Sequence, residues 1–229
     1  MEQMTTITPI ARIQSPFPQK FGIPRQSNIV GGITATVVFE PEFRNADALR
    51  GIDEFDYLWL IWQFSENLRQ QWSPTVRPPR LGGNRRMGVF ATRSSFRPNA
   101  LALSSVRLVD IRWQSPDGPL LFIAGADLMD GTPIFDIKPY LPYTDAHPDA
   151  RSGFAPTPSN RLLDVHFPPE LLAKVDPELR QPLLETLAND PRPSYHNSDN
   201  REYGMTFGEK NIRFKVLENS VLEVLSINF

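Results

Sequence analysis

The first part of the chain is divided by glycine and proline into short apolar segments, and few of these segments have helical periodicity. Residues 33–39 and 57–64 are rich in β-branched and aromatic side chains and have the length of buried strands. Further strands are expected at residues 87–92, 101–111, 120–128 and 134–137, and only residues 46–50 look helical. Strands this dense, with few helical crossovers, predict a mainly β fold in which an antiparallel sheet closes as a barrel, with a parallel α/β sheet as the weaker alternative.

The remainder of the chain predicts a second unit. Residues 149–160, DARSGFAPTPSN, have the small residues and prolines of a linker. Residues 177–188 carry leucines at helical spacing after Asp176, a suitable cap, and strands are expected at 203–207, 212–217 and 221–227, the last two forming a hairpin at 218–220. The sequence therefore predicts a barrel domain at 1–148, a linker at 149–160 and a small α+β domain at 161–229. A unit this small should pack on the barrel or on a second subunit.

Six arginines fall between Pro74 and Pro98, a stretch without aspartate, glutamate or lysine, although the chain has a net charge of -2. Arginine presents a planar fork of donors that binds phosphate or carboxylate oxygens bidentately. The prolines hold part of this stretch extended, and Gly82 and Gly83 permit a tight reversal. We expect a local anion site rather than the alternative, a solvated basic loop. Its arginines are Arg77, Arg80, Arg85, Arg86, Arg93 and Arg97.

Composition excludes several classes of site. The chain has no cysteine, and its three histidines are widely spaced, so we expect neither disulfides nor a metal site. No apolar stretch approaches the ~20 residues that cross a membrane, and the first residues do not resemble a signal peptide, so a cytoplasmic protein is expected. The glycine-rich nucleotide motifs and the usual hydrolase motifs are also missing from the sequence.

Four motifs give the chain a resemblance to a known family. They are SPFPQKFGIPRQ, PTVRPPRLGGNRRMGVFATRSSFRPNALALS, DLMDGTPIFDIKPYLPY and DPRPSYH, in this order. Together they resemble the TsaA-like family, and most closely its bacterial tRNA methyltransferase branch, TrmO, nearly end to end. The resemblance implies a homodimer with a single-sheeted β-barrel that uses S-adenosylmethionine. It also implies methylation of N6 of N6-threonylcarbamoyladenosine, next to the anticodon of threonine-accepting tRNA.

The resemblance also implies which residues bind the cofactor. The set is Pro24, Arg25, Gln26, Ser65, Glu66, Arg93, Leu103, Asp127, Leu128, Met129 and Asp130. Arginines suit the methionine carboxylate of the cofactor, and aspartates suit its ammonium or ribose hydroxyls. Ser65-Glu66 departs from the family, whose members carry His-Gln there. By residue pattern alone, Asp127 to Thr132 is more typical of a turn.

The same resemblance accounts for the arginines, because the modified base carries a carboxylate and lies among phosphates. We expect Arg77, Arg80, Arg85, Arg86, Arg97 and Lys138 to face the substrate, with Phe96 or Tyr143 available to stack on the base. By analogy with Asp-Pro-Pro-Tyr loops of other amino-group methyltransferases, Asp136 or Tyr140 is the candidate base. The alternative is that Asp136 caps a turn and Tyr140 packs.

Two other functions fit the sequence. One is a non-catalytic module that binds S-adenosylmethionine or RNA and regulates. The other is a methyltransferase of the same fold with a different acceptor.

Overall fold

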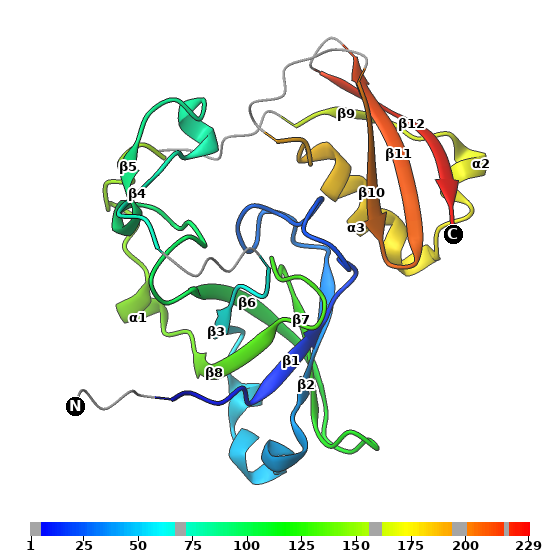
Figure 1. The fold of residues 1–229 in the computed structure, drawn as a ribbon. Coiled ribbons are helices and arrows are strands. Elements are labelled where there is room, and N and C mark those ends of the chain that lie inside the picture. The colour runs from blue at the N-terminus through cyan, green and yellow to red at the C-terminus, as the bar shows by residue number, and fades with distance from the viewer. Residues whose placement is uncertain (1–5, 67–71, 156–161, 194–200, 218–219) are drawn as a thin grey trace.

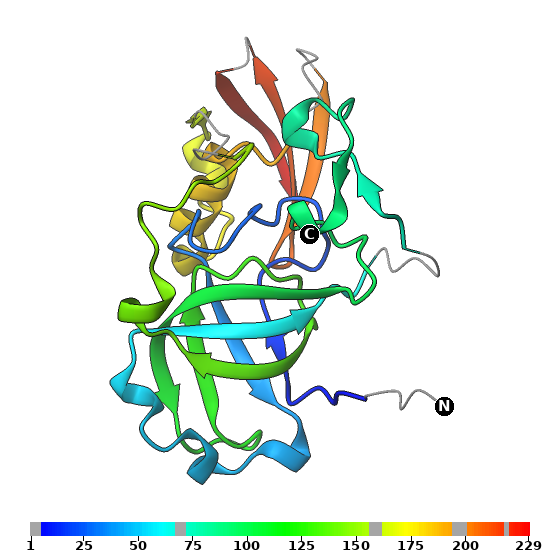
Figure 2. The same ribbon diagram turned by 90° about the vertical axis from the view of Figure 1, so that its left-hand side faces the viewer.

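The computed structural model describes residues 6–66, 72–155, 162–193, 201–217 and 220–229. In these residues the fold is mainly β, as predicted, with a larger sheet in the first part of the chain and a smaller sheet at its C-terminus (Figure 1). A small two-stranded arm stands apart from both sheets, on the same end of the larger sheet as the C-terminal sheet (Figures 1 and 2).

The larger sheet is a closed barrel with the strand order β1-β2-β7-β6-β3-β8. All of its pairings are antiparallel, and β1 closes the ring by pairing with both β2 and β8. The strands are β1 (Ala11–Gln14), β2 (Thr34–Phe39), β3 (Tyr57–Gln63), β6 (Leu101–Arg112), β7 (Leu120–Ala124) and β8 (Pro133–Pro139).

Alternation along each strand separates a buried interior from an outer face. In β3, Leu58, Leu60 and Trp62 are buried, whereas the residues between them are partly exposed. This two-residue period is what a pleated strand produces when one face packs in a core. The inward side chains of the six strands form one apolar cluster that also contains Ala126 and Leu128 from the connection after β7.

Strand direction brings three connections to one end of the barrel. Antiparallel strands alternate in direction, so the ends of β1, β3 and β7 lie at the same end as the starts of β2, β6 and β8. The connections there are residues 15–33, 64–100 and 125–132, and we call this the loop end. Most of the predicted site residues lie in these three connections.

Several predicted elements differ from the structure. Of residues 87–92, only Met87–Gly88 form a strand, because Val89–Ala91 make a 3-10 turn that ends where the Thr92 N–H and hydroxyl bond to the Val89 carbonyl. β7 ends at Ala124, because Gly125 has a left-handed φ of 78°. Ala46–Leu49 form a 3-10 helix, one of three such turns between β2 and β3. The short β1 was not predicted.

The C-terminal part contains a four-stranded sheet and the predicted helix. The sheet order is β10-β11-β12-β9, with β9 parallel to β12 and the other pairs antiparallel. The predicted strands and the 177–188 helix are confirmed, whereas α2 and β9 were not predicted. The turn residues 218–219 lie outside the described part. The elements are α1 (Pro142–Asp145) before this unit, then β9 (Asp164–His166), α2 (Pro169–Leu172), α3 (Pro177–Ala188), β10 (Glu202–Phe207), β11 (Lys210–Leu217) and β12 (Val221–Asn228).

The connection between β1 and β2 packs with the C-terminal sheet. Phe17, Val30 and Ile33 belong to the apolar cluster of that sheet rather than to the barrel cluster. Phe17 meets Phe207 edge-on, with ring centroids 5.4 Å apart. The Gly208 N–H donates to the Pro16 carbonyl at 2.7 Å. The C-terminal unit is therefore anchored on one of the loop-end connections.

None of the described helices is long and apolar enough to cross a membrane.

Candidate functional site

Predicted cofactor residues from three connections meet at the loop end. Arg93 donates from Nη1 to the Gln26 side-chain oxygen, which joins the 64–100 connection to the 15–33 connection. Asp127, from the 125–132 connection, accepts from the Ser27 backbone and lies in the field of Arg93. Gln26, Arg93 and Asp127 are thus brought together, although they are far apart in sequence.

Asp127 is the carboxyl of this cluster, and its pKa is shifted by its surroundings. Burial raises the pKa of Asp127 above its ordinary value, while hydrogen bonds and the charge of Arg93 act to lower it. Ser104 Oγ donates to Asp127 Oδ1 at 2.6 Å and accepts from Trp62 Nε1 at 2.9 Å. Because Trp62 and Ser104 lie on β3 and β6, the barrel wall fixes this carboxylate in position.

Asn28 holds the 15–33 connection against the barrel. Its side-chain amide donates to the Ser105 carbonyl at 2.8 Å, and its backbone N–H donates to the Gly125 carbonyl at 2.9 Å. A Cβ on Gly125 would lie 2.4 Å from Asn28 Oδ1, closer than any real contact. Glycine at position 125 therefore permits both the left-handed turn and the close approach of Asn28.

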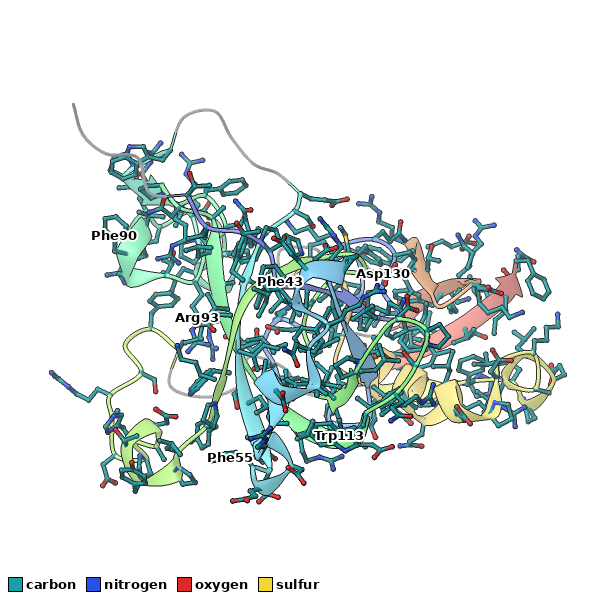
Figure 3. The ribbon with its side chains drawn as sticks, turned by 90° about the horizontal axis from the view of Figure 1, so that it is seen from below. Phe43, Phe55, Phe90, Arg93, Trp113 and Asp130 are labelled. Carbon is teal, nitrogen blue, oxygen red and sulfur yellow. The ribbon has the colours of Figure 1, made fainter. Side chains whose placement is uncertain are left out.

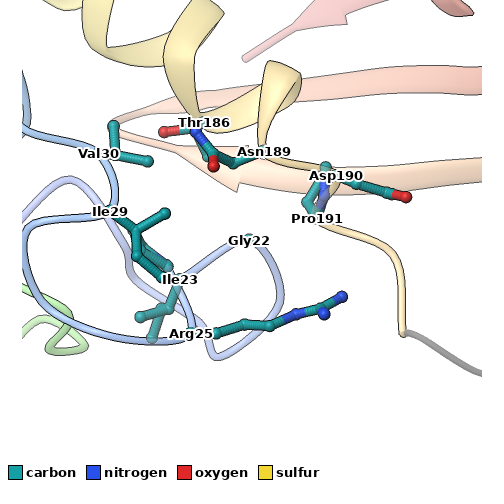
Figure 4. Close-up of a pocket in the computed structure, with 10 residues that line it drawn as sticks. Gly22, Ile23, Arg25, Ile29, Val30, Thr186, Asn189, Asp190 and Pro191 are labelled. Atoms are coloured by element: carbon teal, nitrogen blue, oxygen red, sulfur yellow. The ribbon is translucent and has the colours of Figure 1, made fainter. Parts of the chain in front are cut away.

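Arg25 points to the C-terminal unit. Its Nη2 donates to the Arg192 carbonyl at 2.9 Å, and Arg192 is itself buried and paired bidentately with Asp190 at 2.8 and 2.9 Å. A small cavity of about 60 Å³ lies here, between the loop that carries Arg25 and the end of α3 (Figure 4). It is lined by Gly22, Ile23, Pro24, Arg25, Ile29, Val30, Thr186, Asn189, Asp190 and Pro191.

The other predicted cofactor residues are spread around the loop end. Asp130 Oδ1 accepts from the Ser15 N–H at 2.9 Å, and the Asp130 N–H donates to the Phe17 carbonyl, so Asp130 fixes the chain after β1. In Figure 3, Arg93 lies toward the arm and Asp130 toward the C-terminal sheet. Leu128 is fully buried in the barrel core, so only its backbone is available to a ligand. Met129 accepts from the Thr132 N–H in a turn, and Ser65 and Glu66 are exposed just after β3.

Leu103 and the candidate base Asp136 share a row on the outer face of the barrel. Leu103 pairs with Ile61 across β6 and β3, and Asp136 pairs with Ile61 across β8 and β3. Paired residues of a sheet point to the same face, and Leu103 is 54% exposed, so the row faces outward near the loop end. Asp136 accepts from the Ile137 N–H and forms an ion pair with Lys138 at 2.8 Å.

Tyr140 is placed away from this group. Its backbone N–H donates to the carbonyl of Tyr57 at the start of β3. At roughly 3.3 Å per residue, that point is about 20 Å from the loop end of β3. The Tyr140 ring packs 5.5 Å from Trp59, whose Nε1 donates to Asp145. Hydrogen bonds from the Leu141 N–H and from Trp59 lower the pKa of that aspartate.

Four predicted substrate arginines lie on the two-stranded arm. The arm pairs β4 (Thr75–Val76) with β5 (Met87–Gly88), and the Pro79–Leu81 3-10 turn lies between them. Arg86 donates to the Thr75 hydroxyl at 3.0 Å. The arm arginines, all exposed, are Arg77, Arg80, Arg85 and Arg86. Arg97 lies outside the arm, and its guanidinium donates to the Thr92 carbonyl at 3.3 Å. Phe96 is half-buried, and Tyr143 is exposed on α1.

Sequence reasoning missed the residues that hold the site together. These are Asn28, Trp62, Ser104, Asp190 and Arg192. Ser104 and Ser105 were visible as two hydroxyl residues within the apolar first part of β6, residues 101–106, which is a signal for a buried polar partner. Asn28 has a positive φ of 62°, and no comparable pattern in the sequence predicts this conformation. In the described residues no group of three or more His, Asp or Glu is arranged to hold a metal ion.

Comparison with known proteins matches both parts of the chain. Residues 12–146 match the family model of the tRNA-methyltransferase O N-terminal domain, and residues 160–229 match that of the TrmO C-terminal domain. A protein of Escherichia coli named tRNA (adenine(37)-N6)-methyltransferase is 39% identical over 217 residues, which cover 91% of this chain and 92% of the relative.

Two further similarities span almost the whole chain. A Pseudomonas aeruginosa relative named "Putative S-adenosylmethionine-dependent methyltransferase RcsF" is 37% identical over 230 residues, which cover 97% of each chain. The crystal structure of TrmO from Pseudomonas aeruginosa superposes with a TM-score of 0.79 at 31% identity, over 99% of each chain.

Proposed function

The chain belongs to the TrmO family of tRNA methyltransferases, and on that premise we propose that it transfers the methyl group of S-adenosylmethionine to N6 of adenosine 37 in tRNA. The preferred acceptor is N6-threonylcarbamoyladenosine in threonine-accepting tRNA. The observation that carries the proposal is the meeting of Gln26, Arg93 and Asp127 at the loop end, beside a surface rich in arginine.

The donor set fits the proposed cofactor. S-adenosylmethionine carries a carboxylate, an ammonium, a sulfonium and two ribose hydroxyls, so it needs both cationic donors and anionic acceptors. Arg25 and Arg93 supply the cationic donors. Asp127 supplies the anionic acceptor, and this carboxyl is buried and hydrogen-bonded to Ser104. We assign apolar contacts with the cofactor to Pro24 and Leu103. The backbone of residues 128–129 would offer it peptide groups.

When bound, S-adenosylmethionine supplies an electrophilic methyl group. The residues of this chain have two tasks. Arg93 would bind the carboxylate of the cofactor and Asp127 its ammonium or ribose hydroxyls, which would fix how the methyl group is presented to an acceptor nitrogen. Asp136 lies on the outer row with Leu103, where it accepts from the Ile137 N–H and pairs with Lys138, and its carboxylate is our candidate to take the N6 proton.

The arginine surface suits the acceptor. A threonylcarbamoyl group places a carboxylate on the base, and the anticodon loop surrounds it with phosphates. Arg97 lies in the same connection as Arg93, where its guanidinium donates to the Thr92 carbonyl, and we assign it to the base carboxylate. The arm arginines are suited to the phosphates, because their exposed guanidinium groups stand at the loop end without acidic residues in residues 72–98.

The remaining parts of the proposal concern assembly. We infer a homodimer in the cytoplasm, with residues 1–148 as the catalytic domain, 149–160 as a linker and 161–229 as the C-terminal domain. The C-terminal domain has a task within its own chain, because Arg192 and α3 contact the connection that carries Arg25.

Methyl transfer from labelled S-adenosylmethionine to two matched threonine tRNAs tests the function. One tRNA carries threonylcarbamoyladenosine and the other carries plain adenosine at the same position. Label on the modified tRNA alone supports the proposal. Equal label on both shows that the carboxylate-bearing group is not the determinant, and label on neither, with cofactor binding intact, rejects the enzyme activity on this acceptor.

A further inference from the structure

Two large aromatic side chains are exposed together at the base of the arm. The rings of Trp72 and Phe90 are stacked, with centroids 6.2 Å apart and planes inclined by 28°. Trp72 is 51% exposed and Phe90 is 73% exposed. Single exposed apolar residues are ordinary on protein surfaces, but an exposed stacked pair leaves a broad apolar face in contact with water.

The backbone around this pair is held by hydrogen bonds. The Val89 N–H donates to the Pro74 carbonyl at 2.9 Å, which extends the ladder of the arm from Thr75 and Gly88 toward the aromatic pair. The Thr92 hydroxyl bonds to the Val89 carbonyl at 2.8 Å and closes the turn that carries Phe90. The rings are therefore presented from a fixed scaffold, which reduces the entropy lost when they bind a ligand.

The arm places arginines at the other end of the same ladder. Arg77 and Arg86 follow directly outward from the paired residues Val76 and Met87. Like charges at neighbouring positions across a ladder are unfavourable unless an anion lies between or above them. Residues 72–98 contain six arginines and no acidic residue to provide that anion.

We propose that Trp72 and Phe90 form a stacking platform for an unpaired base of the anticodon loop, while Arg77 and Arg86 bind the adjoining phosphates. This inference rests on the proposed function, because it identifies how the tRNA is held away from the reacting base. Unpaired bases stack on aromatic side chains whatever their sequence, and phosphates follow them along the strand at regular intervals.

Charge favours RNA over a second copy of the chain as the occupant. An apolar platform alone would suit either partner. The arginines beside it require anions from the occupant, and loop RNA provides bases and phosphates together. A second copy, with acidic and basic residues in nearly equal number, 26 against 24, offers no general anionic surface.

The test is the affinity for an anticodon stem-loop RNA, measured by fluorescence anisotropy with full-length variants. We expect Phe90→Ala and Trp72→Ala each to weaken binding roughly 5- to 150-fold, the loss found when a base loses its aromatic partner. Phe90→Tyr should bind like the wild type, and Phe90→Leu, which keeps apolar bulk without a ring, should bind like the alanine variant. Trp113→Ala is the matched control, since Trp113 is 40% exposed beyond the far end of β6 and lies apart from Phe90 (Figure 3).

A second RNA separates stacking from charge. On a fully paired duplex with the same number of phosphates, the aromatic variants should bind like the wild type. Arg77→Ala and Arg86→Ala should weaken both RNAs and reduce the slope of log affinity against log salt by roughly 0.7 to 0.9 for each lost phosphate contact. Wild-type affinity of the aromatic variants for the stem-loop would overturn the platform.

Light scattering and methylation assays keep the alternatives apart. If the aromatic variants change from dimer to monomer, the platform is an interface between copies and the proposal is overturned. If the wild type binds the stem-loop through the platform but does not methylate threonine tRNA, the proposed function fails while the platform stands.

Discussion

Arg25 donates from Nη2 to the backbone carbonyl oxygen of Arg192 at 2.9 Å, so the C-terminal unit directly holds a residue assigned to cofactor binding. The contact is supported from behind, because the Arg192 guanidinium is 5% exposed and paired with Asp190. The same face is fixed by Glu185, which accepts from the Gly32 N–H at 3.1 Å. The C-terminal unit therefore sets the conformation of the connection between β1 and β2.

Weakening the Asp190–Arg192 pair should reduce cofactor affinity. Asp190 has a φ of 52°, which asparagine also tolerates, so Asp190→Asn removes the charge with little backbone strain. We expect the free energy of unfolding to fall by about 2–4 kcal/mol, because Arg192 stays buried with a weaker partner. Calorimetry at a temperature where the variant is folded should show at least a fivefold weaker affinity for S-adenosylmethionine.

Glu223→Gln is the control for that experiment. It breaks the Lys215–Glu223 pair, which joins β11 and β12 of the C-terminal sheet and is more exposed than the Asp190–Arg192 pair. Its affinity for the cofactor should equal that of the wild type. A wild-type affinity in Asp190→Asn as well would show that the C-terminal unit does not position Arg25.

Two glycines with similar backbone angles should respond differently to alanine. Gly125 and Gly131 have φ of 78° and 73°, so each substitution costs about 1–2 kcal/mol of left-handed strain. A Cβ at position 131 meets nothing within 4 Å, whereas at position 125 it meets Asn28 Oδ1 at 2.4 Å. Thermal unfolding should therefore show a larger loss for Gly125→Ala, and cofactor affinity should fall in that variant alone. Equal losses would mean that Asn28 moves aside freely.

We expect Asp127 to lower the stability of the fold at neutral pH while it contributes to cofactor binding. Its folded-state pKa is raised by burial above the unfolded value, 3.8, so both states are protonated well below pH 4. As the pH rises, this carboxyl ionises first in the unfolded chain, so the free energy of unfolding falls. The fall ends once the pH exceeds the folded-state pKa. Asp127→Asn removes this penalty and keeps an acceptor for Ser104.

We expect Asp127→Asn to be more stable than the wild type at pH 7 by roughly 0.5–2 kcal/mol, a typical gain for one stabilising substitution. The difference should shrink as the pH is lowered toward 4. Affinity for S-adenosylmethionine should fall about tenfold, the scale of a hydrogen bond to a charged group. Denaturant titrations at several pH values and calorimetry check these outcomes, and a destabilised variant at pH 7 would contradict them.

Arg97 should act on tRNA more than on the cofactor. Arg97→Ala is expected to lower kcat/KM for modified threonine tRNA roughly 10- to 150-fold, the range for a lost hydrogen bond to an anion. Cofactor affinity should change less than about twofold. Arg50→Ala, in an exposed pair with Asp47 between β2 and β3, should leave both unchanged. Equal loss of both in Arg97→Ala would place this side chain on the cofactor.

The two candidate bases should separate in single-turnover kinetics. Asp136 shares an outer row with Leu103, whereas Tyr140 packs on Trp59 toward the other end of the barrel. Asp136→Asn should reduce the rate of the methyl-transfer step by about a hundredfold or more if this carboxylate takes the proton. Tyr140→Phe keeps the ring packing and should react at the wild-type rate. The opposite pattern would reverse the assignment.

The strands could be predicted because their signals are local. Runs of β-branched and aromatic residues indicate the strands β2, β3 and β6, and the leucine spacing indicates the helix α3. Each of these patterns can be recognised within a short segment of the sequence. The composition of residues 74–98 likewise predicted a positively charged, anion-binding surface without any tertiary information. The family motifs added the identity of most candidate site residues.

Only the tertiary structure decided which of those residues meet. Antiparallel pairing brings three connections to one end of the barrel, where Gln26, Arg93 and Asp127 come together, and places Tyr140 near the other end. Two hydrogen-bonding partners fix the site from other parts of the chain: Ser104, on β6, holds Asp127, and Arg192, after α3, holds Arg25. Neither contact is marked by a periodic pattern in the sequence. Contacts between segments distant in sequence depend on sheet register and domain packing, and neither is a property of any single segment.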